Sequence, residues 1–222
     1  MKICEILKRK DIGSMGIGAM IVFIAMVLVA GIAASVLVLT ANRLETQAMI
    51  TGEQTTAEVS TGIAVFDIEG HVTNSAVDNM TISVRARAGS GDIDLAQTVI
   101  EISDGSTKVL LSYNLANTWN FNTSVNNWNG QIFSVHTLAW NMTNEEFGIL
   151  VLEDADGSCT PATPVINRGD SVMLCIKAEA CFTGGLTARD DVWGTIMPEE
   201  GTPGTFSFRV PSSLSDTVYD LY

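Results

Sequence analysis

The stretch MGIGAMIVFIAMVLVAGIAASVLVL, residues 15–39, decides the fold, because it contains no ionisable side chain. As an α-helix with a rise of ~1.5 Å per residue, it would extend for roughly 37 Å. That length crosses a hydrocarbon layer of ~30 Å with some tilt. A basic leader that contains Lys2, Lys8, Arg9 and Lys10 comes directly before it. The sequence therefore predicts a helix that spends part of its life in a membrane.

Three interpretations of this helix compete. A secretory signal peptide is disfavoured, because its apolar core has roughly 7 to 15 residues and Leu39-Thr40-Ala41 is a poor cleavage site. A permanent transmembrane anchor fits the length of the run. A pilin-type leader also fits, in which a peptidase cuts before the apolar run and the helix stays on the mature protein as an assembly element.

Two segments near opposite ends of the chain carry a family resemblance. The first is KRKDIG, residues 8–13, with SMGIGAMIVFIAMVLVAGIAASVL, residues 14–37; the second is GTIMPEEGTPGTFSFRVPSSL, residues 194–214. The first resembles the start of archaeal flagellins (archaellins), the type IV pilin-like subunits of the archaeal swimming filament, almost letter for letter over residues 16–30. The second is similar to the same family in its Pro-Glu-x-Gly turn, aromatic strand and Pro-Ser ending.

The resemblance implies three parts of the chain. Residues 1–13 would be a prepilin-type (class III) leader, cleaved between Gly13 and Ser14, residues 14–61 a hydrophobic assembly helix, and residues 62–222 an immunoglobulin-like β-sandwich. The implied partners are identical or related subunits in a helical filament, a prepilin-type peptidase, and a membrane assembly platform with its ATPase. No cofactor is required for this role.

The charge of the chain excludes one class of partner and orients the helix. The formal charge is −13, and removal of residues 1–13 leaves 8 basic and 23 acidic side chains, a charge of −15. Such an acidic protein is not expected to bind nucleic acid, whose phosphates require patches of lysine and arginine. Basic residues gather before the apolar run, so the N-terminus is predicted to be cytoplasmic and the chain after about Thr40 external.

The pattern beyond residue 39 predicts a longer helix and then a sandwich. The helix is expected to end between Ser60 and Gly62, since glycine favours a helix end. In Met80–Ala88, even-numbered apolar residues alternate with Ser83, Arg85 and Arg87, which is typical of a strand with one buried face. The other predicted strands are 63–72, 93–102, 108–113, 131–138, 147–152, 171–178 and 205–210. The predicted fold class is therefore α+β, a long hydrophobic N-terminal helix followed by an antiparallel β-sandwich.

Motifs for catalysis are scarce. The two histidines, His71 and His136, have no cysteine or carboxylate at a ligand-like spacing, and the sequence has no phosphate loop, Gly-x-Ser-x-Gly or His-Glu-x-x-His motif. Gly16-Ile17-Gly18 follows no strand, so it is not a nucleotide loop. We expect a protein that is not an enzyme.

Cysteines and acidic residues leave two weaker predictions. Without the leader, Cys159, Cys175 and Cys181 remain, and they are either buried free thiols or include one disulfide, for which Cys175 and Cys181 have a suitable spacing. Asp154 and Asp156, in the sequence Asp-Ala-Asp-Gly, resemble half of a calcium loop. They indicate either a plain acidic turn or a structural divalent cation.

Three glycosylation sequons lie in the part predicted to be external. They begin at Asn79, Asn122 and Asn141. Asn122 is the strongest candidate, because the tract NTWNFNTSVNNWNGQ, residues 117–131, has the composition of an exposed loop.

The function predicted from these observations is structural. The chain is expected to be an archaellin that polymerises through its N-terminal helix into an extracellular filament for swimming, after insertion of the precursor in the membrane. An archaeal type IV adhesion pilin is the close alternative, and a membrane-anchored cell-surface binding protein is the alternative from another class.

Overall fold

The structure is a computed structural model that describes residues 2–117, 121–122, 132–135, 140 and 142–222. The chain divides into two compact units, Met1–Gln54 and Thr55–Tyr222. The first unit is helical throughout its described residues. The second contains the end of the helix and all of the described strands.

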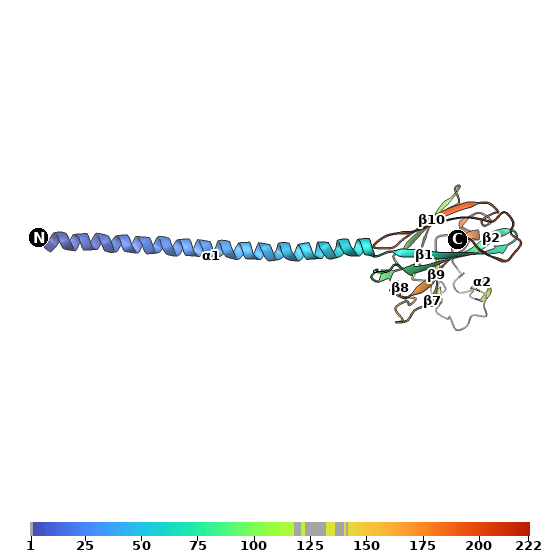
Figure 1. Ribbon diagram of the computed structural model, residues 1–222, viewed down its shortest axis with the longest axis horizontal. Coiled ribbons are helices and arrows are strands. Elements are labelled where there is room, and N and C mark those ends of the chain that lie inside the picture. Colours follow the sequence, from blue (N-terminus) through green and yellow to red (C-terminus); the bar gives the residue numbers. More distant parts are fainter. Residues whose placement is uncertain (1, 118–120, 123–131, 136–139, 141) are drawn as a thin grey trace. The chain divides into compact units, whose positions relative to one another are not determined.

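Helix α1 runs without interruption over Lys2–Ser60 (Figure 1). Its sequence contains no proline, and the hydroxyls of Thr40, Thr46 and Thr51 donate hydrogen bonds to backbone carbonyls four residues earlier, at 2.8 to 3.0 Å. These bonds satisfy polar side chains within the helix itself. The helix ends at Ser60, inside the interval expected from the sequence.

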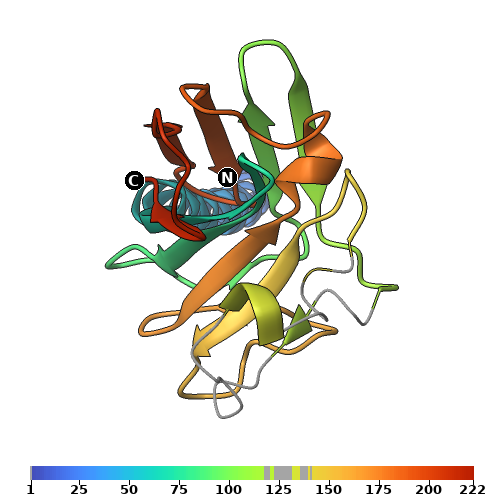
Figure 2. The same cartoon turned by 90° about the vertical axis from the view of Figure 1, so that its right-hand side faces the viewer.

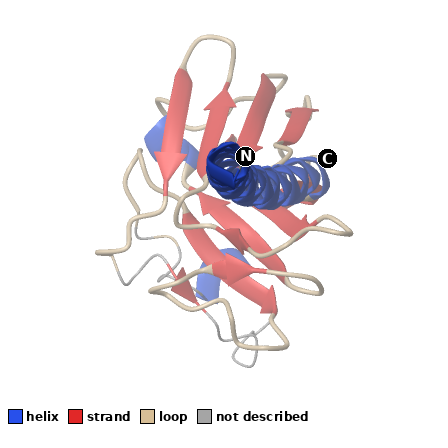
Figure 3. Cartoon of the chain, turned by 90° about the vertical axis from the view of Figure 1, so that its left-hand side faces the viewer, coloured by secondary structure: helices blue, strands red, loops and turns tan. Residues whose placement is uncertain are grey.

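The described part of the second unit forms three sheets, drawn in red in Figure 3. A six-stranded sheet has the order β12-β1-β2-β9-β7-β6, a four-stranded sheet the order β11-β10-β4-β5, and a two-stranded sheet pairs β3 with β8. All neighbours are antiparallel except β6 and β7. The strands are β1 (Ile63–Thr73), β2 (Ala76–Ala86), β3 (Ile93–Asp94), β4 (Val99–Ser103), β5 (Lys108–Ser112), β6 (Phe121–Asn122), β7 (Gly148–Glu153), β8 (Val165–Ile166), β9 (Ser171–Ile176), β10 (Asp191–Met197), β11 (Gly204–Arg209) and β12 (Val218–Asp220).

The main core lies between the six-stranded and the four-stranded sheet. Ile82 and Leu174 from the larger sheet and Ile102, Ile196 and Phe206 from the smaller sheet belong to one buried cluster. Figure 2 shows the two sheets as separate groups of strands. The expected fold class, a long apolar helix followed by an antiparallel sandwich, is confirmed.

The six-stranded sheet is also covered on its outer face, which the sequence did not predict. Ser83, predicted to lie on the polar face of β2, is 1% exposed, and Thr81 on the same face is 0% exposed. Their ladder partners Cys175 and Met173 belong to a second buried cluster with Leu150 and Met142, and Ile132 packs against this cluster. Ile132 lies in the short helix α2 (Ile132–Val135). The alternation in β2 is real, but polar residues occupy a face that another part of the chain covers.

Two strand predictions were wrong in their bounds or type. Within the predicted strand 131–138, the described residues Ile132–Val135 are helical, and the remainder lies outside the described residues. The predicted strand 93–102 is split into β3 and β4. Asp94 causes the break, because its carboxylate accepts the Ala96 N–H at 2.8 Å and its carbonyl accepts the Thr98 hydroxyl at 3.0 Å.

Strand β10 was missed altogether. Its core-facing positions are Val192, Gly194 and Ile196, so the pattern is interrupted by a residue without a side chain. A Cβ at Gly194 would lie 2.3 Å from the Phe206 ring and 2.5 Å from the Glu101 carbonyl oxygen. Glycine is required here by the close approach of neighbouring strands. A second short helix, α3 (Ala178–Cys181), follows β9.

Candidate assembly helix and surface sites

The apolar part of α1 exposes large side chains in every direction around its axis. Five consecutive residues, Met20 to Ile24, are each at least 52% exposed. Since successive residues of a helix are rotated by about 100°, five in a row sample the whole circumference. Among the described residues, Met15–Ser60 is the helix that is long and apolar enough to cross a membrane. A helix that is apolar all round requires a nonpolar surrounding, either lipid or protein.

The predicted cleavage position falls within this helix. Gly13 and Ser14 lie inside α1, between the basic leader and the apolar run. Cleavage there would remove Lys2, Lys8, Arg9 and Lys10 and leave a helix whose next basic residue is Arg43. The position therefore separates a charged segment from an uncharged one.

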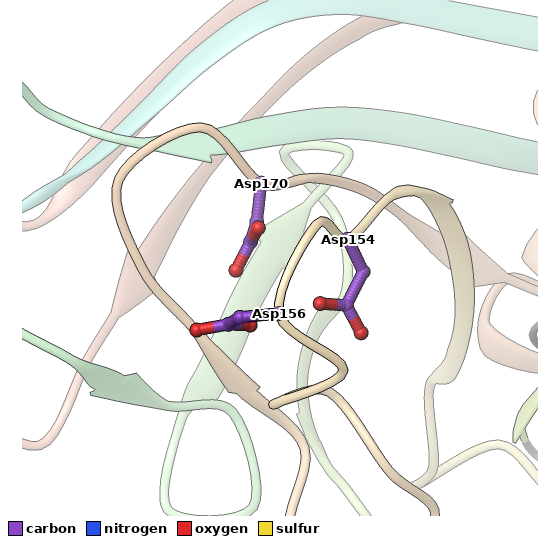
Figure 4. A group of neighbouring side chains, drawn as sticks. All are labelled: Asp154, Asp156 and Asp170. Atoms are coloured by element: carbon purple, nitrogen blue, oxygen red, sulfur yellow. The ribbon is translucent and has the colours of Figure 1, made fainter.

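Asp154 and Asp156 meet a third carboxylate that the sequence analysis missed, Asp170 (Figure 4). One oxygen from each lies within 4.8 Å of the others. The loop around them is held by hydrogen bonds: Asp154 accepts the Gly157 N–H at 2.8 Å, and Asp170 accepts the Asn167 N–H at 2.9 Å.

Hydrogen bonds also surround Asp156 within this acidic cluster. Asp156 accepts hydrogen bonds from the Asn167 amide at 2.5 Å and the Ser158 N–H at 3.0 Å. These bonds, the Asn167 bond first, lower the pKa of Asp156, which is fully exposed. Asp170 is 3% exposed. Oxygen ligands of this kind suit Ca²⁺. The bound divalent cation stays a prediction, and its predicted ligands are Asp154, Asp156 and Asp170.

We expect Ca²⁺ to stabilise the wild-type domain through these carboxylates. At a concentration of ~100 Kd, a ligand of the folded state adds about 2.7 kcal/mol, which corresponds to roughly 5–10 °C in Tm at about 2–4 °C per kcal/mol. Asp156→Asn should reduce this gain, whereas Asp216→Asn, at another exposed carboxylate, should keep it. Thermal unfolding in Ca²⁺ and in a chelator measures both. An equal Tm in the two buffers for the wild type would leave the cluster as an acidic turn.

Of the two alternatives for the cysteines, the structure has the buried free thiols. Cys159, Cys175 and Cys181 are buried free thiols, so the bridge between Cys175 and Cys181 is not formed. The reason is their placement: Cys175 belongs to the second cluster, on the outer side of the six-stranded sheet, whereas Cys181 belongs to the main core. Burial raises the pKa of Cys181 to about 11, so this thiol is a poor nucleophile.

The structure separates the three sequons. Asn79 lies within β2, half-buried, and Thr81 of the same sequon has a buried hydroxyl without a hydrogen-bond partner. Asn122 is not in a loop: it belongs to β6 and is paired with Leu150, while the adjacent Phe121 is buried in the main core. Asn141 lies outside the described residues.

Glycosylation at Asn122 stays a prediction from its sequon, whereas the buried hydroxyl of Thr81 argues against modification at Asn79. A transferase has to reach both the asparagine and the hydroxyl of a sequon, and Thr81 is inaccessible once the sandwich has folded. Peptide mass mapping of native filaments should therefore show a mass increment on the peptide that contains Asn122 and none on the peptide that contains Asn79. Asn122→Gln should remove that increment. An unmodified Asn122 peptide would contradict the prediction.

The fold and the helix together define the class of the protein. A uniformly apolar N-terminal helix that follows a basic leader and precedes a β-sandwich is the organisation of a pilin-like filament subunit. The archaeal-type flagellin family model matches residues 13–208. The chain belongs to the archaeal-type flagellin family.

Individual relatives agree with this assignment. The chain is 43% identical to flagellin B2 of Methanocaldococcus jannaschii over 98% of this chain and 97% of that protein. It is 35% identical to flagellin A of Methanococcus voltae over 98% and 97%. The protein is thus a structural subunit of the archaeal flagellum filament.

Two solved structures support the same fold. The crystal structure of archaeal flagellin FlaB1 from Methanocaldococcus jannaschii matches with a TM-score of 0.65 and 26% identity, over 72% of this chain and 96% of that one. The archaeal flagellum of Methanospirillum hungatei strain JF1 matches with a TM-score of 0.61 and 14% identity, over 93% and 98%. The second similarity concerns the fold alone.

Proposed function

We propose that α1, from Ser14 onward, is the element through which this protein polymerises with identical or related subunits for swimming motility. The observation that carries the proposal is the exposure of apolar side chains all around the helix between residues 15 and 39. In lipid these side chains are favourably placed, each by roughly 0.3 to 0.6 kcal/mol for Leu, Ile, Phe and Val. A helix that leaves the membrane needs an equally nonpolar surrounding, and a bundle of the same helices provides it.

Leader cleavage fits this role. The leader contains four basic residues, at positions 2, 8, 9 and 10, and charges without partners are costly in a dry helix bundle. A prepilin-type peptidase that cuts between Gly13 and Ser14 removes them before assembly. The match of the family model from residue 13 onward is consistent with this position.

Growth of the filament follows from the type of contact. Each subunit uses one surface against a different surface of the next, and such a contact does not close into a ring when rotation is combined with a rise along the axis. Extraction of the helix from lipid requires energy, which we assign to a separate ATPase on the cytoplasmic side of a membrane assembly platform. The precursor is held in the membrane by α1 until that step, with its outer domain external.

Electron microscopy of purified surface filaments, combined with peptide mass mapping, tests the proposal. The expected result is a filament that contains peptides of this chain. Deletion of the gene should abolish swimming and leave surface attachment intact, whereas an adhesion pilin would show the reverse. The chain recovered only from the membrane fraction would contradict polymerisation and support an anchored binding protein.

A further inference from the structure

Within the sandwich, the outer face of the four-stranded sheet exposes three large apolar side chains among polar and charged ones. We call it the open face, and it consists of the residues of β4, β5, β10 and β11 that point away from the main core. Trp193, Met197 and Leu110 on this face are 48%, 36% and 56% exposed. Val99, the ladder partner of Met197, is only partly buried.

Trp193 lies over the turn between β4 and β5. A Cβ at Gly105, whose φ is +88°, would be 3.3 Å from the Trp193 ring. The indole of Trp193 thus packs over Gly105, where a side chain would push against the ring. Nearly half of the surface of Trp193 nevertheless remains open to solvent. A large aromatic side chain that is held in place on a sheet and stays exposed is typical of a contact surface.

The open face is also electrically neutral in a strongly acidic protein. Its basic residues are Lys108 and Arg209, and each lies next to an acidic one: the Lys108 Nζ is 2.7 Å from a Glu101 oxygen, and the Arg209 Nε is 3.5 Å from an Asp191 oxygen. The mature chain as a whole has a formal charge of −15. Two copies of so acidic a protein repel each other over most of their surfaces, and this repulsion is smallest where one of them presents a neutral face.

The two sheets differ in how the chain itself treats their outer faces. On the six-stranded sheet, α2 and Met142 contribute to the second cluster and bury Thr81, Ser83 and Cys175. Figure 2 shows α2 beside β7 and β9. Among the residues that the structure describes, no such cluster lies on the outside of β10 and β4. Trp193 and Met197 therefore stay exposed in the described chain, whereas Thr81 and Ser83 are buried.

We propose that the open face contacts the outer domain of a second copy of this chain within the filament. This inference rests on the proposed function, since polymerisation is what brings copies together at a fixed spacing. The neutral charge, the exposed Trp193 and the pairing of every charge on the face favour another copy of the same acidic protein over a basic partner, which would be attracted to the acidic surfaces instead.

The size of the open face determines whether the contact between two outer domains can form before the helices assemble. Four strands about 4.8 Å apart and five residues long present a footprint of roughly 300 Å², whereas a stable pair of proteins buries about 800 Å² on each partner. The contact is too small to hold two free subunits together. It forms after the helices have assembled, because their bundle keeps neighbouring domains at a high effective concentration.

Charge substitutions on the open face test the inference in the full-length protein. Leu110→Glu and Trp193→Glu should lower the yield of filaments by about tenfold or more, as expected for a buried contact residue. Val218→Glu is the matched control, because Val218 is a strand residue 48% exposed on the other sheet. Its filament yield should equal that of the wild type, and Trp193→Phe should also assemble. Thermal unfolding of detergent-dispersed subunits identifies any variant that fails to fold; Leu110, on the edge strand β5, is the position that tolerates a charge best.

Oxidation by hydroxyl radicals provides a second measurement that needs no substitution. Trp193 and Met197 should be oxidised several-fold more slowly in wild-type filaments than in dispersed subunits, whereas Tyr222, 59% exposed, should react equally in both. Equal rates at Trp193 and Met197, or normal filaments from Leu110→Glu, would overturn the inference and leave the face for a partner outside the filament. In that case, purified filaments that contain the chain still support the proposed function. Purified filaments that lack the chain would contradict both the proposed function and the contact at the open face.

Discussion

Cells that produce the Ile24→Lys or the Val27→Lys variant are expected to form no filaments of this protein. Ile24 and Val27 are 52% and 54% exposed on α1, in the middle of the uncharged run. A lysine at the centre of an apolar helix costs about 2.5 to 3.5 kcal/mol in a membrane, and each added subunit would bring another unpaired charge into the shared bundle. The penalty therefore grows with every step of polymerisation.

The controls separate assembly from folding. Ile24→Leu keeps the apolar character and should assemble, and Gln97→Lys adds the same charge at an exposed turn of the sandwich and should assemble too. The thermal unfolding of the sandwich should be unchanged in all variants, because residues 1–54 form a separate compact unit. Electron microscopy and sedimentation of filaments provide the readout. Normal filaments from both lysine variants would show that these side chains do not face a dry interior.

The helix could be predicted from the sequence because its signal is local. The absence of charge over residues 15–39 and the absence of proline up to residue 60 hold whatever the rest of the chain does. The strands around Ile82 and Phe206 were also predicted, because apolar and polar residues alternate along both of them. Such patterns need no knowledge of which strands are neighbours.

Features that depend on pairing between distant segments could not be predicted. Strand β10 was missed because Gly194 occupies a core position, and only the nearness of Phe206 explains the glycine. Asp170 was missed because its approach to Asp154 and Asp156 is made by the loop that returns through β8. Neither fact has a signal in the spacing of the residues along the chain.

The cysteines illustrate the same limit. Cys175 and Cys181 are close in sequence, and their spacing is compatible with a bridge between a strand and the turn that follows it. The structure places them in different clusters, because β9 directs Cys175 to the outer side of its sheet, while Cys181 ends α3 against the main core. Short separation in sequence indicates contact only when the intervening backbone keeps both side chains on one side.

Replacement of Gly13 by valine is expected to block processing and, with it, assembly. The wild-type filament protein should begin at Ser14, and the Gly13→Val variant should retain the whole leader. The family resemblance implies glycine at the last position of the leader, and a branched side chain there would obstruct the peptidase. The retained leader would bring Lys2, Lys8, Arg9 and Lys10 into the helix bundle, where the cost of each unpaired charge is similar to that at Ile24.

N-terminal sequencing and the mass of the membrane-bound protein give the readout for Gly13→Val. Its membrane form should be heavier than the wild-type protein by the leader, with no filaments, while Ile12→Val, which changes a neighbouring apolar residue conservatively, should be processed and assembled. A filament protein that begins at Met1, or beyond Ala41, would exclude the pilin-type interpretation. Filaments built from uncleaved Gly13→Val subunits would show that the bundle tolerates four basic residues per subunit. The dry, uncharged interior proposed for α1 would then be wrong, because charges at such a density cannot be buried without partners.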